Sequence, residues 1–217
     1  MLSVVVPTLN AEAHLPGCLE RMKAADEIVV VDGGSSDSSV AMADRAGARL
    51  VRSPAGRGAQ LGAGAEAAKG DWLLFLHADT IPGERWRAAA ADHIARSAKA
   101  ACFRFRLADG AWQARLIERA VALRVALLGL PFGDQGLLVS RRLYEAVGGY
   151  RPLPLMEDVD LVRRIGRRRL TVLDEEARTS AERWRRDGWI GRPARNLACL
   201  GLYAAGVSPE RIARFYA

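Results

Sequence analysis

Short apolar runs and helical patterns alternate along the first half of the chain. Four runs with little polar alternation predict strands buried on both faces of a sheet, at residues 2–6, 27–31, 48–51 and 73–76. The spacing of Leu15, Leu19 and Met22 predicts a first helix, and further helices are expected at residues 36–46 and 57–69. A strand–helix repeat is typical of an α/β fold, so we expect a mostly parallel, doubly wound sheet with helices on both faces.

The second half departs from this repeat. Phe103 and Phe105 alternate with Arg104 and Arg106, which predicts a strand with one apolar and one basic face. We expect helices at residues 84–98, 112–128 and from 157 onward, and strands at 137–139 and 170–173. The helix at 157 begins with acids and ends with arginines, as the helix macrodipole favours.

Three carboxylates follow predicted strands or occupy loops: Asp32, Asp79 and Asp158. The carboxyl ends of parallel strands are where α/β sheets bind ligands, and Asp32 and Asp79 fall at one such edge. Carboxylate oxygens suit Mg²⁺ or Mn²⁺ bridging a diphosphate rather than Zn²⁺. The alternative for Asp79 is that it only caps a helix beginning near Pro82.

A glycine-rich segment, residues 56–62, contains Arg57 and resembles a dinucleotide-binding loop only partly. It lies in the wrong place for the first turn of a dinucleotide-binding domain. A glycine-rich helix start with an arginine still suits a phosphate or a nucleotide edge. Close helix packing explains the glycines equally well.

Four segments, in this order, resemble the family 2 glycosyltransferases of the GT-A fold: residues 3–10, 28–37, 75–80 and the pair Glu157-Asp158. The resemblance covers roughly residues 2–175. Within the family, the HADT run of residues 77–80, Gly133-Asp134-Gln135 and Met156-Glu157-Asp158 are similar to a bacterial subgroup of arsenosugar-biosynthesis-type or radical-SAM-associated transferases.

The resemblance implies a role for each matched position. Asp158 would be the general base with Glu157 beside it, and Asp79 would match the last aspartate of the DxD metal motif, whose first aspartate is His77 here. The nucleotide-binding set would be Pro7, Thr8, Asn10, Asp32, Arg57, Gln60, His77 and Ala78. The acceptor side would comprise Asp134, Gln135, Arg183 and Trp184, the last two resembling the end of a QxxRW motif that lacks its glutamine.

The resemblance further implies an inverting glycosyltransferase that uses Mg²⁺ or Mn²⁺. It would move a sugar from a nucleotide-diphosphate sugar, with UDP expected, to an unidentified hydroxyl acceptor that is lipid-linked or a small molecule. One alternative is a nucleotidyltransferase, but residues 7–12 lack the basic, glycine-rich loop that such an enzyme needs after its first strand. The other is a basic module that binds membrane or nucleic acid without transfer activity; we expect no nucleic-acid partner.

Composition indicates the kind of partner and the cellular location of the protein. The net charge of +7 indicates an anionic partner. Cys18, Cys102 and Cys199 are widely spaced and form no CxxC motif, which predicts reduced thiols, no structural zinc and a cytoplasmic location. The N-terminus has no basic segment before its first apolar run, so we expect no signal peptide.

We divide the chain into a GT-A domain at residues 1–178 and a basic amphipathic tail at residues 179–217. The domain would have a nucleotide-binding half at about 1–100 and an acceptor half at about 101–178. Tryptophan and arginine beside an apolar segment in the tail are typical of a helix at a membrane surface, here the inner face. Because no apolar run reaches the roughly 20 residues of a span, contact would be peripheral. The alternative is that the tail packs on the domain or on a second subunit of a homodimer.

Overall fold

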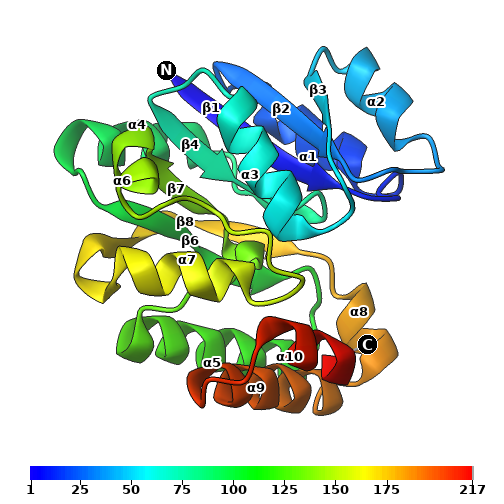
Figure 1. Cartoon of the computed structure of the whole chain (residues 1–217), viewed down its shortest axis with the longest axis vertical. Coiled ribbons are helices and arrows are strands. Elements are labelled where there is room, and N and C mark those ends of the chain that lie inside the picture. Colours follow the sequence, from blue (N-terminus) through cyan, green and yellow to red (C-terminus); the bar gives the residue numbers. More distant parts are fainter. Residues whose placement is uncertain (217) are drawn as a thin grey trace.

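The computed structural model describes residues 1–216 as one eight-stranded sheet covered by helices on both faces (Figure 1). The strands are β1 (Leu2–Thr8), β2 (Glu27–Asp32), β3 (Arg49–Arg52), β4 (Trp72–Phe75), β5 (Thr80–Pro82), β6 (Ala100–Leu107), β7 (Leu137–Ser140) and β8 (Leu170–Thr179). The helices are α1 (Leu15–Met22), α2 (Ser39–Arg45), α3 (Arg57–Ala67), α4 (Trp86–Arg96), α5 (Trp112–Leu128), α6 (Arg141–Ala146), α7 (Glu157–Ile165), α8 (Glu182–Asp187), α9 (Gly191–Ala204) and α10 (Pro209–Tyr216). The strand order is β3-β2-β1-β4-β7-β6-β8-β5.

The first four strands form the expected parallel half. β1 pairs in parallel with β2 and β4, and β2 pairs in parallel with β3. Val4, Val5 and Val29 are fully buried, as the unbroken apolar runs predicted. The carboxyl ends of β1, β2 and β4 therefore lie at one edge of the sheet.

The rest of the sheet is mixed rather than mostly parallel. β7 is antiparallel to both β4 and β6, and β5 is antiparallel to β8, whereas β6 and β8 are parallel. The helix expected from residue 84 begins at Trp86, because residues 80–82 form β5 first. Thr80 pairs with Thr179, a partner so distant in sequence that no local pattern indicates it. The alternative in which Asp79 only caps a helix beginning near Pro82 is therefore wrong.

β1 also runs two residues past its expected end at Val6. Its pairing with β2 continues to Thr8, whereas its pairing with β4 stops at Val5. Pro7 lies beyond the end of β4, so its missing N–H removes no hydrogen bond from that side of the ladder. The proline therefore fits inside the strand rather than ending it.

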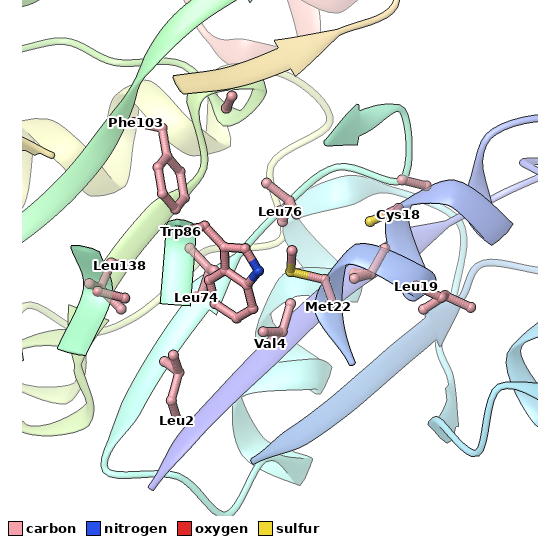
Figure 2. Close-up of a cluster of buried hydrophobic side chains, with 14 of the residues drawn as sticks. Leu2, Val4, Cys18, Leu19, Met22, Leu74, Leu76, Trp86, Phe103 and Leu138 are labelled. Atoms are coloured by element: carbon pink, nitrogen blue, oxygen red, sulfur yellow. The ribbon is translucent and has the colours of Figure 1, made fainter. Parts of the chain in front are cut away.

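Two apolar layers cover the two faces of the sheet. Figure 2 shows the layer in which Val4, Met22, Trp86 and Phe103 meet, beneath α1, α2 and α4. The indole N–H of Trp86 donates to the Arg21 carbonyl oxygen over 3.0 Å, which satisfies its one polar atom. The opposite layer packs α3, α6 and α7 against the sheet. These two layers hold the sheet edge that carries the candidate site.

The tail, α8 to α10, lies beside α5 at the end of the molecule away from α2 and β3 (Figure 1). Trp184 is buried against α5 and β6, and Cys199 is buried with Leu155 and Ile212. These tail residues therefore pack on the domain, which was the alternative to membrane contact. Ile190 and Leu197 of the tail are nevertheless 84% and 70% exposed. Among residues 1–216, no helix combines the length and the apolar character that crossing a membrane requires.

Candidate active site

A cavity lies where the loop after β4, the start of α7, the end of β8 and the tail converge. Eight of the predicted site residues line it: Arg57, His77, Asp79, Asp134, Glu157, Asp158, Arg183 and Trp184. They come from segments up to about 130 positions apart in the chain, so the fold alone brings them together. Polar groups that converge in one concave site are what a binding or catalytic centre requires.

Asp158 is held by two hydrogen bonds at the first turn of α7. The backbone N–H of Gly133 donates to its Oδ2 over 3.0 Å, and the Tyr150 hydroxyl donates to its Oδ1 over 3.1 Å. Met156, with φ of +66°, turns the chain into the helix just before it. A carboxylate fixed through both oxygens beside a cavity is oriented to accept a proton from a bound hydroxyl.

Glu157 is buried beside Arg57. Its Oε1 lies 2.9 Å from Arg57 Nε, and its side chain is only 1% exposed. Burial and the neighbouring Asp158 charge raise the pKa of Glu157 to about 7, although Arg57 opposes the shift. Burial disfavours the charged form of Arg57, but the Glu157 and Asp158 carboxylates outweigh it and raise the Arg57 pKa. Arg57 therefore supplies a permanent cation at the cavity wall.

We expect Glu157→Gln to stabilise the fold at alkaline pH. The folded-state pKa of about 7 lies above the ordinary 4.5, so the folded chain binds more protons than the unfolded chain between these values. Stability is therefore lost as the pH rises through this window. Glutamine removes the loss, with a gain of about 1–3 kcal/mol at pH 8 and little change at pH 5.

Urea unfolding at both pH values measures this effect. Glu145→Gln is the matched control, because the Glu145 side chain is 64% exposed and should shift stability little at either pH. Equal changes for Glu157→Gln at pH 5 and pH 8 would contradict the raised pKa.

Four buried polar atoms of residues that line the cavity have no hydrogen-bond partner within residues 1–216: His77 Nε2, Asp134 Oδ1, Glu157 Oε1 and Arg192 Nε. Burial, followed by the Arg57 charge, lowers the pKa of His77 and favours its neutral form. Burial and the charges of Asp158 and Asp79 raise the pKa of Asp134 to about 6, against the effect of Arg124. Polar atoms left open in a buried cavity are ready to bind a polar ligand.

Asp79 is the candidate metal ligand. Its side chain is 16% exposed, and its nearest cation is Arg183, whose Nη2 lies 3.8 Å from Asp79 Oδ2. Across residues 1–216, no cluster of three or more histidine, cysteine, aspartate or glutamate side chains has a metal-binding arrangement. Mg²⁺ is commonly bound by one or two carboxylates together with substrate phosphates and water. The donor set therefore fits a cation that arrives with a diphosphate.

Asn10, in the loop after β1, and Asp32, the last residue of β2, lie outside this cavity. The Asp32 carboxylate accepts hydrogen bonds from the N–H groups of Gly34 and Ser35, each over 3.0 Å at the closer oxygen. Asn10 Oδ1 accepts from the N–H of Ser36 over 2.9 Å. The Asp32 bonds hold the loop after β2, and the Asn10–Ser36 bond joins it to the loop after β1, which forms one polar surface at the carboxyl edge of the parallel strands.

The remaining predicted residues lie outside the cavity, where they are buried or hydrogen-bonded to the backbone. The Gln60 amide donates to the carbonyl oxygens of Thr8 and Val31, each over 2.8 Å, and so links β1 to β2. Gln135 donates to the Phe103 carbonyl oxygen over 3.1 Å. Four of the predicted residues are buried within strands, turns or the core: Pro7, Thr8, Ala78 and Gln135. None of these, nor Gln60, lines the cavity.

Sequence reasoning missed several residues of the cavity. Tyr150 and Gly133 hold Asp158, and Arg192, Asn196 and Tyr216 of the tail line the wall. Gly133 belonged to the Gly-Asp-Gln loop and could have been considered with it. No motif marks Tyr150, and the tail residues were grouped only as part of a basic amphipathic segment.

The comparisons with known proteins agree with this fold. The family model for glycosyl transferase family 2 matches residues 3–135. Two solved structures with the GT-A fold are similar: glucosyl-3-phosphoglycerate synthase from Mycobacterium tuberculosis and S. aureus TarS 1-349. The first contains Mn²⁺, UDP and glucosyl-3-phosphoglycerate, with TM-score 0.58, 22% identity and coverage of 83% of this chain and 70% of that one. The second contains UDP-GlcNAc, with TM-score 0.65, 18% identity and coverage of 82% and 58%.

Two curated relatives match in sequence. The PGL/p-HBAD biosynthesis glycosyltransferase of Mycobacterium tuberculosis is 40% identical over 90 residues, which is 36% of this chain and 35% of the relative. The undecaprenyl-phosphate 4-deoxy-4-formamido-L-arabinose transferase of Pseudomonas aeruginosa is 33% identical over 171 residues, 68% of this chain and 49% of the relative. The chain spans a third to a half of the length of these relatives. With the family model matching more than half of it, the chain belongs to glycosyl transferase family 2.

Proposed function

We propose that this protein transfers a sugar, with inversion, from a UDP-linked donor to an acceptor hydroxyl. The observation that carries the proposal is Asp158, fixed by Gly133 and Tyr150 on the cavity that Asp79 also lines. Family membership and neighbours that contain UDP or UDP-GlcNAc support the donor class. The other assigned roles, for the nucleotide and acceptor residues, belong to the same proposal.

The reaction would be a single displacement. Asp158 takes the proton of the acceptor hydroxyl while the oxygen of that hydroxyl attacks the anomeric carbon of the sugar. The bond between the anomeric carbon and the diphosphate breaks in the same step. UDP leaves and the anomeric configuration inverts, because attack and departure occur on opposite faces. Arg57 and Arg183 bring positive charge to the cavity where charge develops.

Asp79 would hold Mg²⁺ or Mn²⁺, which would stabilise the negative charge of the leaving diphosphate. The nucleoside would bind on the polar surface of Asn10 and Asp32, with Thr8 and Gln60 supporting it from below. The Mn²⁺ and UDP in glucosyl-3-phosphoglycerate synthase support this arrangement.

Calorimetry with UDP, GDP and ADP, each with and without Mn²⁺, tests the donor class. We expect UDP to bind in a metal-dependent manner and Asp79→Ala to weaken that binding about tenfold or more, since the variant removes a charged ligand of the cation. Asp92→Ala is the control, because the Asp92 side chain is 72% exposed on α4. Failure of every nucleotide to bind, or unchanged metal-dependent UDP affinity in Asp79→Ala, would overturn the proposal.

The nucleotidyltransferase alternative differs in its leaving group. Glycosyl transfer releases UDP, whereas nucleotidyl transfer releases inorganic diphosphate. Product analysis after one incubation with a UDP-sugar and an acceptor, and another with UTP and a sugar 1-phosphate, therefore separates the two activities: UDP is released in the first by a glycosyltransferase, and inorganic diphosphate in the second by a nucleotidyltransferase. The subgroup resemblance of the HADT and Met-Glu-Asp motifs stays a prediction, as does the cytoplasmic location.

We also propose peripheral membrane contact through exposed apolar residues of the tail. Ile190 and Leu197 are exposed while Trp184 packs on α5, so contact would use the start and the outer side of α9. We expect co-sedimentation with anionic vesicles that weakens as salt rises, and reduced binding for Ile190→Ser with Leu197→Ser. Ala205→Ser, exposed at the end of α9, is the control. Absence of vesicle binding by the full chain would contradict the proposal.

A further inference from the structure

The tail gives the cavity a basic wall that the motifs do not describe. Arg192 and Asn196 of α9 line the cavity beside Arg183 and Trp184 of α8. Arg192 and Asn196 are four positions apart, so they lie on the same face of the helix. Their side chains therefore reach the cavity together.

Positive charge exceeds negative charge in the cluster that Asp187 forms with its arginine partners, one of which is Arg192. Asp187 accepts hydrogen bonds from three arginines: Arg186 over 2.8 Å, Arg192 over 2.9 Å and Arg195 over 3.0 Å. One carboxylate neutralises only one of the three guanidinium charges. Hydrogen bonds from Arg186 and Arg192 lower the pKa of Asp187 to about 2, so this carboxylate stays ionised. The cluster keeps a net positive charge for a ligand to neutralise.

Arg192 also has N–H groups that no acceptor in the described residues occupies. It uses Nη1 to bind Asp187, while its Nε is buried and has no hydrogen-bond partner within residues 1–216. Its side chain is 13% exposed, and its guanidinium carbon lies 5.4 Å from the centroid of the Trp184 ring. The ring and Asp187 fix the guanidinium before any ligand arrives, which lowers the entropy cost of binding one.

On the basis of the proposed transfer reaction, we propose that Arg192 and Asn196 bind a phosphate group on the acceptor, next to the hydroxyl that receives the sugar. A guanidinium presents paired N–H donors that match phosphate oxygens, and an amide adds a further donor. A fixed basic wall would orient the accepting hydroxyl toward Asp158.

The position of the wall favours the acceptor over the donor. The proposed nucleoside surface lies after β1 and β2, whereas α9, which carries Arg192 and Asn196, lies beside α5, beyond β7 and β6 (Figure 1). Within the tail, Glu182 of α8 approaches the segment after β1, with its Oε2 3.2 Å from His14 Nε2. Asp79, the proposed ligand of the diphosphate-bound cation, follows β4, between these two regions in the strand order. A ligand on Arg192 would therefore occupy the side of the cavity away from the nucleoside.

Calorimetry on the full chain, with and without saturating UDP and Mn²⁺, tests the proposal. The probes are glycerol 3-phosphate, as a soluble phosphate, and dihexanoyl phosphatidylglycerol, as a lipid headgroup, with glycerol as the uncharged control. We expect one phosphate probe to bind and Arg192→Gln to weaken it about tenfold or more, since a charge-assisted hydrogen bond is lost. The stronger probe identifies the source of the phosphate.

Two further variants make the test specific. Asn196→Asp keeps the size of the side chain but adds a negative charge, and should weaken the phosphate probe to a similar extent. Arg211→Gln removes an exposed arginine of α10 and should leave binding unchanged. UDP affinity, measured in parallel, should stay the same in all three variants.

Three results would overturn the phosphate site: no binding of either probe when UDP binds normally, equal probe affinity in Arg192→Gln and Asn196→Asp, or binding that UDP abolishes. The third would place the probe in the diphosphate position. Loss of UDP binding by the native chain would instead count against the proposed function itself.

Discussion

Replacing Asp158 with asparagine should reduce sugar transfer by about 10²–10⁴-fold, the range that a general base contributes. Asparagine keeps the size of the side chain and can still accept a hydrogen bond from Gly133 or Tyr150, but it cannot take the proton of the acceptor. UDP binding should stay within a few-fold of the native value, because Asp158 is assigned to the acceptor proton and not to the nucleotide. Steady-state transfer rates, with UDP calorimetry alongside, measure the two effects separately.

A graded variant sharpens this test. Tyr150→Phe removes only the hydroxyl that donates to Asp158 Oδ1 over 3.1 Å, so it should reduce transfer by less than Asp158→Asn, about tenfold. Asp174→Asn is the surface control, since the Asp174 side chain is 87% exposed. Near-native turnover in Asp158→Asn would remove Asp158 from the role of base, whatever the Tyr150 variant shows.

The parallel half of the sheet could be predicted because burial leaves a local signal. A strand covered on both faces needs apolar residues at successive positions, as in Val4, Val5 and Val6. The short length of such an apolar run distinguishes a strand from a buried helix. The mixed half carries no equivalent signal. β5 exists because Thr80 pairs with Thr179, and β8 extends past residue 173 to make that pairing. Long-range pairing cannot be deduced from the composition of either segment.

The charged residues of the candidate site could be predicted because they belong to sequence motifs. The residues that hold them by hydrogen bonds could not be predicted. Asp79, Glu157 and Asp158 were identified, and all three line the cavity. Tyr150 was missed because its hydroxyl reaches Asp158 through a turn after Gly149 that only the folded chain defines. The family resemblance assigns Gln60 to the nucleotide-binding set. Its amide donates to two backbone carbonyl oxygens, a pair of contacts that no motif indicates.

Replacement of Gly133, whose N–H donates to Asp158, is expected to have the second large effect on sugar transfer. A Cβ on Gly133 would lie 2.6 Å from Asp158 Oδ2 and would also overlap His77 Nε2, which is closer than real Cβ atoms approach their neighbours. Gly133 does not have a positive φ, so the backbone itself would accept alanine and the effect comes from these contacts alone. Because the neighbours are the proposed base and a residue of the loop that carries Asp79, the proposed metal ligand, relief of the overlap must move one of them.

We therefore expect Gly133→Ala to reduce transfer by about 10²-fold, the effect of displacing a catalytic group by roughly 1 Å. The fold should lose only about 1–3 kcal/mol, as for other overpacked sites, so the loss of activity would exceed the loss of folded protein. Gly201→Ala is the matched control, because a Cβ there meets nothing within 4 Å and alanine favours the helix. Transfer rates and urea unfolding of both variants give the comparison. Native activity in Gly133→Ala would show that Asp158 does not act from the position that the Gly133 N–H defines.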